Sequence, residues 1–122
     1  MATWNEVREF LGENFKQDIG MQAISGAGSY AADVEANGSS ATILIFDSSP
    51  LIQVTGFIGH ENQINLEKLI KNLNIFGLKN ANGTYALQHI GIMESLDSIE
   101  LLAPIRLMAG EIVELKGKLG LN

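Results

Sequence analysis

Cysteine is absent from this 122-residue chain, which excludes a disulfide framework, a thiolate nucleophile and every metal site built on sulfur ligands. No stretch comes near the roughly 18 uninterrupted apolar residues that a membrane-spanning helix needs. The amino terminus also lacks a basic segment followed by an apolar run, the pattern of a secretory signal. We therefore expect a soluble protein of the reducing cytoplasm that does not act at a membrane.

Positive charge is scarce as well. Eight lysines and arginines stand against 14 acidic residues, which gives a formal net charge of −6 and a sequence pI near 4.7. The chain thus lacks the positive field that attracts phosphate backbones, and no nucleic-acid partner is expected. Proline occurs only twice, and 46% of the residues are hydrophobic, a composition typical of globular proteins. The length fits one domain over residues 1–122.

Three amphipathic helices are predicted from capping residues and apolar stripes. Thr3 and Asp97 each have a glutamate three residues later, which is the spacing of a capping box. Asn65 can cap a middle helix of about three turns, which Asn74 would end in the left-handed conformation. Pro104 interrupts the last pattern, so it either kinks this helix or lies in the first turn of a helix that begins near it.

Several stretches predict strands, because their apolar residues alternate with small or polar ones or because the run is apolar throughout. They span residues 19–36 with a break at 26–28, then 42–46, 51–58, 75–78 and 84–93. Asn37-Gly38 and Asn82-Gly83 supply the residue pairs of tight hairpin turns. The resulting order is α-β-β-β-α-β-β-α, an α+β fold with helices packed on a mostly antiparallel sheet.

The strand over residues 42–46 is apolar on both faces. Ile43 and Ile45 point to one side of the predicted sheet, and Leu44 and Phe46 point to the other. A sheet with helices on one face does not need apolar groups on its second face. The sequence therefore predicts apolar surface beyond that required for the core.

A glycine-containing segment is the clearest candidate for a ligand site. Gly26-Ala-Gly28-Ser-Tyr-Ala31 matches the pattern of a dinucleotide-binding loop, and Asp47 follows about 20 residues later. The pattern requires a helix after the glycines, but residues 30–36 alternate in polarity and end at a hairpin pair. We therefore predict a bend or loop at Gly26–Gly28, and keep a nucleotide or small-ligand site at Gly26–Ala31 with Asp47 as the alternative function.

No other pattern predicts catalysis or metal binding. His60 and His89 lie on different elements, without a partner at ligand spacing. Acidic residues that share a face are expected to be solvated, and turn serines have no base nearby in sequence. These groups are Asp33 with Glu35, Glu111 with Glu114, Ser39-Ser40 and Ser48-Ser49. We predict a protein that is not an enzyme and that uses no metal or cofactor.

The segment Leu66–Asn74, followed by Asn82–Gln88 and the long terminal helix, gives the chain a resemblance to the type III secretion chaperone-like fold, including the YbjN-type domains of bacteria and cyanobacteria. The resemblance implies a homodimer, without a cofactor, that holds a partner polypeptide in extended form on apolar grooves. It places the dimer contact around the second helix and the strand after it. The corresponding residues are Leu69, Leu73, Phe76 and Leu78.

The residues of this region give an independent reason to expect a dimer. Large apolar side chains crowd residues 66–78 on a helix stripe and on both sides of a strand. One sheet face cannot cover all of them, so Phe76 or its neighbours should face outward and mark an interaction site. We therefore predict a non-enzymatic protein-binding module.

Overall fold

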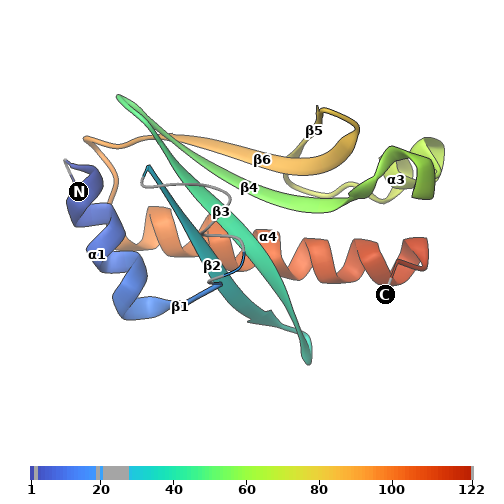
Figure 1. Cartoon of the computed structure of the whole chain (residues 1–122), viewed down its shortest axis with the longest axis horizontal. Helices are drawn as coiled ribbons and strands as arrows, with labels where there is room; N and C mark the ends of the chain where they lie inside the picture. The colour runs from blue at the N-terminus through green and yellow to red at the C-terminus, as the bar shows by residue number, and fades with distance from the viewer. Residues whose placement is uncertain (2, 19, 21–27, 122) are drawn as a thin grey trace.

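The computed structural model describes residues 1, 3–18, 20 and 28–121. Within this part of the chain, three α-helices and a short 3₁₀ turn accompany six strands (Figure 1). In chain order the elements are α1 (Trp4–Asn14), β1 (Lys16–Gln17), β2 (Ser29–Ala36), β3 (Ser39–Ser48), β4 (Leu51–His60), η1 (Glu61–Gln63), α3 (Leu66–Asn72), β5 (Gly77–Ala81), β6 (Thr84–Ile92) and α4 (Ser98–Leu119). The predicted α+β class and element order are confirmed, with β1 as an additional short strand.

The predicted helix caps are all present. The Thr3 hydroxyl accepts the backbone N–H of Glu6 at 3.2 Å, which starts α1. The side chain of Asn65 accepts the N–H of Lys68 at 3.1 Å, and that of Asp97 accepts the N–H of Glu100 at 2.8 Å. Each cap satisfies one of the backbone donors that a helix leaves free in its first turn.

The end of α3 differs from the prediction. The helix has 7 residues and stops at Asn72, and Leu73 continues in an extended conformation with φ −64° and ψ 142°. Among the described non-glycine residues, only Asn37 and Asn82 have positive φ, so the prediction of a left-handed Asn74 is wrong. The reason is tertiary, because a carboxylate of α4 holds the backbone at Asn74 and Ile75, as described below.

Pro104 lies inside α4. The helix begins at Ser98, six positions earlier, so the possibility that Pro104 opens it is wrong. Proline has no N–H to donate to the carbonyl of Glu100, one turn before it. The helix continues to Leu119 and ends at Gly120, whose φ of 70° is the left-handed cap common at helix ends.

The six strands form one antiparallel sheet in the order β1-β2-β3-β4-β6-β5. Its hairpins at Asn37-Gly38 and Asn82-Gly83 have the positive φ values that the sequence predicted. Apart from Gly20, the predicted strand residues 19–23 lie outside the described part of the chain.

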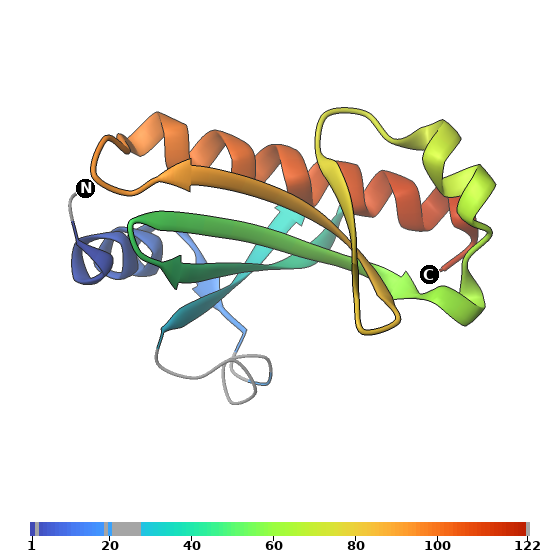
Figure 2. The same cartoon turned by 90° about the horizontal axis from the view of Figure 1, so that it is seen from above.

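The main core lies between one face of the sheet and the helices. Helix α4 runs along that face, with α1 beside its start and α3 beside its end (Figures 1 and 2). It can pack closely on β4 because Gly56 has no side chain, and an added Cβ would lie 3.1 Å from both Ile43 and Ile112. Each large aliphatic group buried under α4 contributes about 1.5–3 kcal/mol. These include Leu101, Ile105, Met108, Ile112 and Leu115.

The second face of the sheet is also partly apolar, as the sequence predicted. Leu44 and Phe46 of β3 point to this face, because Ile43 and Ile45 belong to the core beneath α4. Leu51, Ile90 and Ile92 on β4 and β6 share it and are exposed. The fold thus leaves large apolar side chains in contact with solvent at one end of the β4–β6 pair.

Candidate functional site

An apolar groove lies between the end of β6 and the first half of α4. Its volume is about 480 Å³. We call it the β6–α4 groove and define it by its lining residues: Ile75, Phe76, Gly77, Leu78, Gln88, His89, Ile90, Ala103, Pro104 and Leu107. Two large apolar side chains of the groove are exposed, those of Ile75 at 62% and Leu107 at 53%, whereas Ile90 borders the groove with its backbone and points its side chain to the second face of the sheet. Scattered single exposures are ordinary on a protein surface, but a contiguous group of this kind marks a candidate binding site.

One wall of the groove is a single face of α4. Ala103 and Pro104 are four and three residues before Leu107, so both lie next to it on the helix surface. The residues that anchor α4 in the core, such as Ile105 and Met108, occupy a different face. Leu107 is therefore a large apolar residue outside the buried stripe of its helix.

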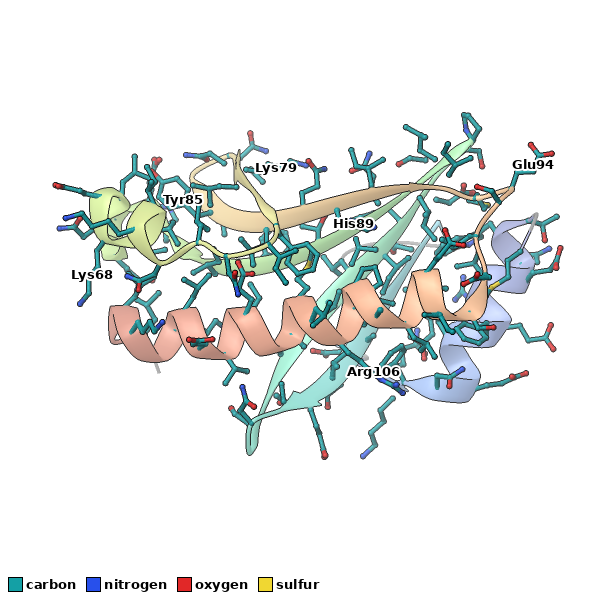
Figure 3. All side chains as sticks on the ribbon, turned by 180° about the vertical axis from the view of Figure 1, so that it is seen from behind. Lys68, Lys79, Tyr85, His89, Glu94 and Arg106 are labelled. Atoms are coloured by element: carbon teal, nitrogen blue, oxygen red, sulfur yellow. The ribbon has the colours of Figure 1, made fainter. Side chains whose placement is uncertain are left out.

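The opposite wall is formed where β5 and β6 separate. Pairing of β5 with β6 begins at Gly77 and Gln88, whereas β6 remains paired with β4 as far as Ile92. His89 of β6 faces α4, because it pairs with the core residue Val54. Figure 3 shows His89 on the side of β6 next to α4. Its ring meets that of Phe76 edge to face, with centroids 6.1 Å apart and an interplanar angle of 83°.

A buried carboxylate positions the segment that carries Ile75. Glu111 of α4 is 7% exposed, and its Oε1 accepts the backbone N–H of Ile75 at 3.0 Å. Its other oxygen, Oε2, lies 3.5 Å from the backbone nitrogen of Asn74. The expectation of a solvated Glu111 is therefore wrong, while Glu114 is exposed and pairs with Lys118 at 2.9 Å. The Glu111 carboxylate replaces the helix cap predicted at Asn74 and directs the Ile75 side chain outward.

The groove becomes acidic beyond Ile92. Glu94 follows β6 at this end of the molecule (Figure 3), and Asp97 and Glu100 lie at the start of α4. All three residues are exposed. The backbone N–H of Glu100 donates to Asp97 and holds the pKa of that carboxyl below its ordinary range. The Met1 ammonium donates to the carbonyl of Leu96 and offsets the charge of the nearby Asp97, so the negative field at this end of the otherwise neutral groove comes mainly from Glu94 and Glu100.

The four residues predicted at a dimer contact are not equally accessible. Leu69 is fully buried and Phe76 is 8% exposed, so both belong to the core of one chain. Leu73 and Leu78 are half-buried against that core. The outward-facing apolar groups are their neighbours, including Ile70 on α3 and Ile75 in the groove.

Comparison with known proteins gives no relative. The chain matches no protein family, no curated protein and no solved structure. The resemblance to chaperone-like folds therefore stays a prediction from the sequence.

The described part of the glycine segment does not have the dinucleotide-binding geometry. Gly28 is followed directly by strand β2, so no helix begins there, as predicted, while Gly26 and Ala27 lie outside the described residues. Gly28 and Asp47 are neighbours, since the N–H of Asp47 donates to the carbonyl of Gly28 at 2.9 Å. The Asp47 carboxylate accepts the N–H of Ser49 at 3.2 Å and so stabilises the β3–β4 turn. A pyrophosphate would need the N-terminus of a helix after Gly28, and the chain forms strand β2 there instead.

Other kinds of site find little support in the described residues. They contain no group of three or more histidine, aspartate or glutamate side chains placed to hold a metal ion. None of their helices is long and apolar enough to cross a membrane. His60 uses Nδ1 to accept the N–H of Asn62 at 3.2 Å and caps the η1 turn.

Proposed function

We propose that this protein is a non-enzymatic, homodimeric binding module that takes up a partner polypeptide on its apolar surface. The observation that carries the proposal is the β6–α4 groove, in which exposed Ile75 and Leu107 border a space of about 480 Å³. Grooves of this size, lined by apolar side chains with few polar groups, are the usual form of a binding site.

The chemistry of the groove favours binding over catalysis. His89 is the polar side chain that faces the groove, and it contacts the ring of Phe76, whereas Gln88 donates to Gln53 on the second face of the sheet. The groove lining contains no serine, threonine or lysine that His89 could activate as a nucleophile. Its binding energy would come from apolar surface removed from water, at about 25 cal/mol per Å².

A second apolar area supports the dimer. Leu66 and Ile70 on α3 are 42% and 55% exposed, and Ile75 lies a few residues further along the chain. A two-fold contact between identical surfaces is the commonest way to cover such an area. We therefore place the dimer contact at the outer side of α3 rather than at the buried Leu69 and Phe76.

Selection from a library of random dodecapeptides displayed on phage tests polypeptide binding. The wild type should enrich peptides that share a consensus sequence. The variant Leu107→Asp should not bind these peptides, because it places a charge in the groove. Leu51→Asp is the matched control, since Leu51 is an exposed β4 residue on the second face of the sheet and outside the groove lining. No enrichment, or equal binding by Leu107→Asp, would rule out the proposed function of the groove.

Light scattering at micromolar concentration tests the dimer separately. We expect a mass of twice 13.2 kDa for the wild type. Ile70→Asp should shift the mass toward the monomer, because two like charges would meet at the two-fold contact, and Leu51→Asp should not. A wild-type mass near 13.2 kDa would exclude the dimer without affecting the groove.

A further inference from the structure

The end of β6 beside the groove has an unpaired edge. Between His89 and Ile92, β6 is bonded to β4 on one side, but its pairing with β5 has already ended at Gln88. Across the described ranges, no strand lies against the outer side of these four residues. An open strand edge presents free N–H and C=O groups and acts as a template for another extended chain.

The register identifies the residue that presents these groups. In an antiparallel pair, residues that exchange hydrogen bonds alternate with residues that do not. The two-residue turn at Asn82-Gly83 makes Ala81 and Thr84 a bonded pair. Even-numbered residues of β6 therefore direct their backbone groups to the β5 side, and the N–H and C=O of Ile90 both point to the open edge.

An added strand would fill the groove with every second side chain. The residue opposite Ile90 would point away from α4, and those opposite His89 and Gly91 would point toward it. Gly91 has no side chain, so the residue opposite it has room for a large apolar group. That group would lie in the groove against Pro104 and Leu107.

A second copy of this chain does not fit this edge. In an antiparallel two-fold pairing of residues 89–92, the side chains directed into the groove are those of His89 and Gly91. One is an imidazole and the other is a hydrogen atom, so neither fills an apolar groove. The occupant is therefore a different extended segment.

Charge at the end of the groove defines a further feature of this segment. Beyond Ile92 lie the exposed Glu94, Asp97 and Glu100, and residues 80–105 include no lysine or arginine. Glu100 is four residues before Pro104 and so continues the groove-lining face of α4. A partner with a basic residue at this end would be attracted by the carboxyl groups of Glu94 and Glu100, since the Met1 ammonium already lies near Asp97.

We infer that the partner is an extended polypeptide segment that adds to β6 as an antiparallel strand at His89–Ile92. It exchanges backbone hydrogen bonds with Ile90, and it places a large apolar side chain in the β6–α4 groove. It carries a lysine or arginine on the amino-terminal side of this apolar anchor, because antiparallel pairing brings that side to Glu94 and Glu100. This inference rests on the proposed polypeptide-binding function.

The peptides selected from the dodecapeptide library test this binding mode through their backbone. Each amide of one selected peptide is N-methylated in turn, and the affinity is measured by fluorescence anisotropy. We expect losses of at least about tenfold at alternate positions, where an N–H faces β6, and changes within about threefold between them. Sensitivity without alternation, or apolar residues spaced three and four apart, would overturn strand addition while leaving the proposed function intact. Failure to select any peptide would overturn both.

The acidic end is tested by charge variants. Replacing the basic residue of the peptide with glutamine should lower its affinity for the wild type, and the loss should shrink in Glu100→Gln. Glu67→Gln is the matched control, because Glu67 is an exposed acid on α3, away from the groove. An equal loss for the wild type and Glu100→Gln would contradict the assigned direction of the strand.

Discussion

Glu111 illustrates how one side chain can override a local sequence signal. Asparagine often ends helices in the left-handed conformation, and Asn74 follows α3 at a suitable distance. The Glu111 carboxylate, 37 residues further along, instead binds the extended backbone at Asn74 and Ile75. A long-range hydrogen bond of this kind leaves no periodic mark in the sequence, so the end of α3 could not be predicted.

Truncating Glu111 should therefore destabilise the protein. Glu111→Ala leaves the N–H of Ile75 without its acceptor in a part-buried position, at a cost of about 1–3 kcal/mol in the free energy of unfolding. Glu111→Gln keeps one acceptor oxygen and should lose less. Urea denaturation measures both, and Glu114→Ala is the control, because its exposed pair with Lys118 contributes at most about 1 kcal/mol. Equal losses for Glu111→Ala and Glu114→Ala would contradict this role.

Asp97 makes the free energy of unfolding depend on pH in the acidic range. Its hydrogen bond from the N–H of Glu100 lowers the pKa of the folded-state carboxyl. A lowered pKa means that the charged cap stabilises the fold above about pH 4, the ordinary value, and that this contribution disappears as the pH falls through the lower folded-state value.

The variant Asp97→Asn isolates this effect, because asparagine also caps helices but does not titrate. Between pH 7 and about pH 3, the wild type should lose more unfolding free energy than the variant does. Urea denaturation at each pH measures the difference between the two proteins. A difference that stays constant across this range would show that the Asp97 charge does not stabilise α4.

At the scale of elements, local signals predicted most of the fold. Thr3, Asn65 and Asp97 start the three helices by caps that depend on residues three positions away. The asparagine–glycine pairs likewise fix two hairpins, because few other residues adopt their positive φ values. Such signals can be recognised in a sequence because the side chain and the backbone that it stabilises lie within a few residues of one another.

The position of Pro104 within α4 could not be predicted from such local signals. The apolar stripe of α4 continues through Pro104, and its burial against the sheet outweighs the lost backbone hydrogen bond. Whether Pro104 lies within the helix or in its first turn depends on tertiary packing, which a local sequence pattern does not contain.

The contact between α4 and β4 depends on Gly56. An added Cβ would lie 3.1 Å from Ile43 and Ile112, so Gly56→Ala should overpack the core and cost about 1–3 kcal/mol. Gly110→Ala is a control with the opposite sign, because nothing lies within 4 Å of its added Cβ. It should raise stability by about 0.5–1 kcal/mol, since alanine is the better helix former. Thermal or urea unfolding of the two variants checks both signs, and stabilisation by Gly56→Ala would contradict the close packing.

At the scale of the molecule, the candidate site could be predicted only in part from the sequence. Surplus apolar surface was predicted from the two-sided strand at residues 42–46 and from the crowded region of Leu66–Leu78. The sequence also contains a further signal in Leu107, a large residue outside the apolar stripe of α4. The groove itself depends on where β5 stops pairing with β6, and this register is set by the whole sheet.

The backbone amide of Ile90 provides the most direct test of the proposed site. Hydrogen exchange by NMR compares the free protein with the protein saturated by a selected peptide. The Ile90 amide should exchange rapidly in the free protein and become protected at least about tenfold on binding, because its N–H then has a partner. The His89 amide is bonded to β4 in both states and should change little. Protection of Ile90 before peptide is added, or an unchanged Ile90 rate at saturation, would contradict strand addition at this groove.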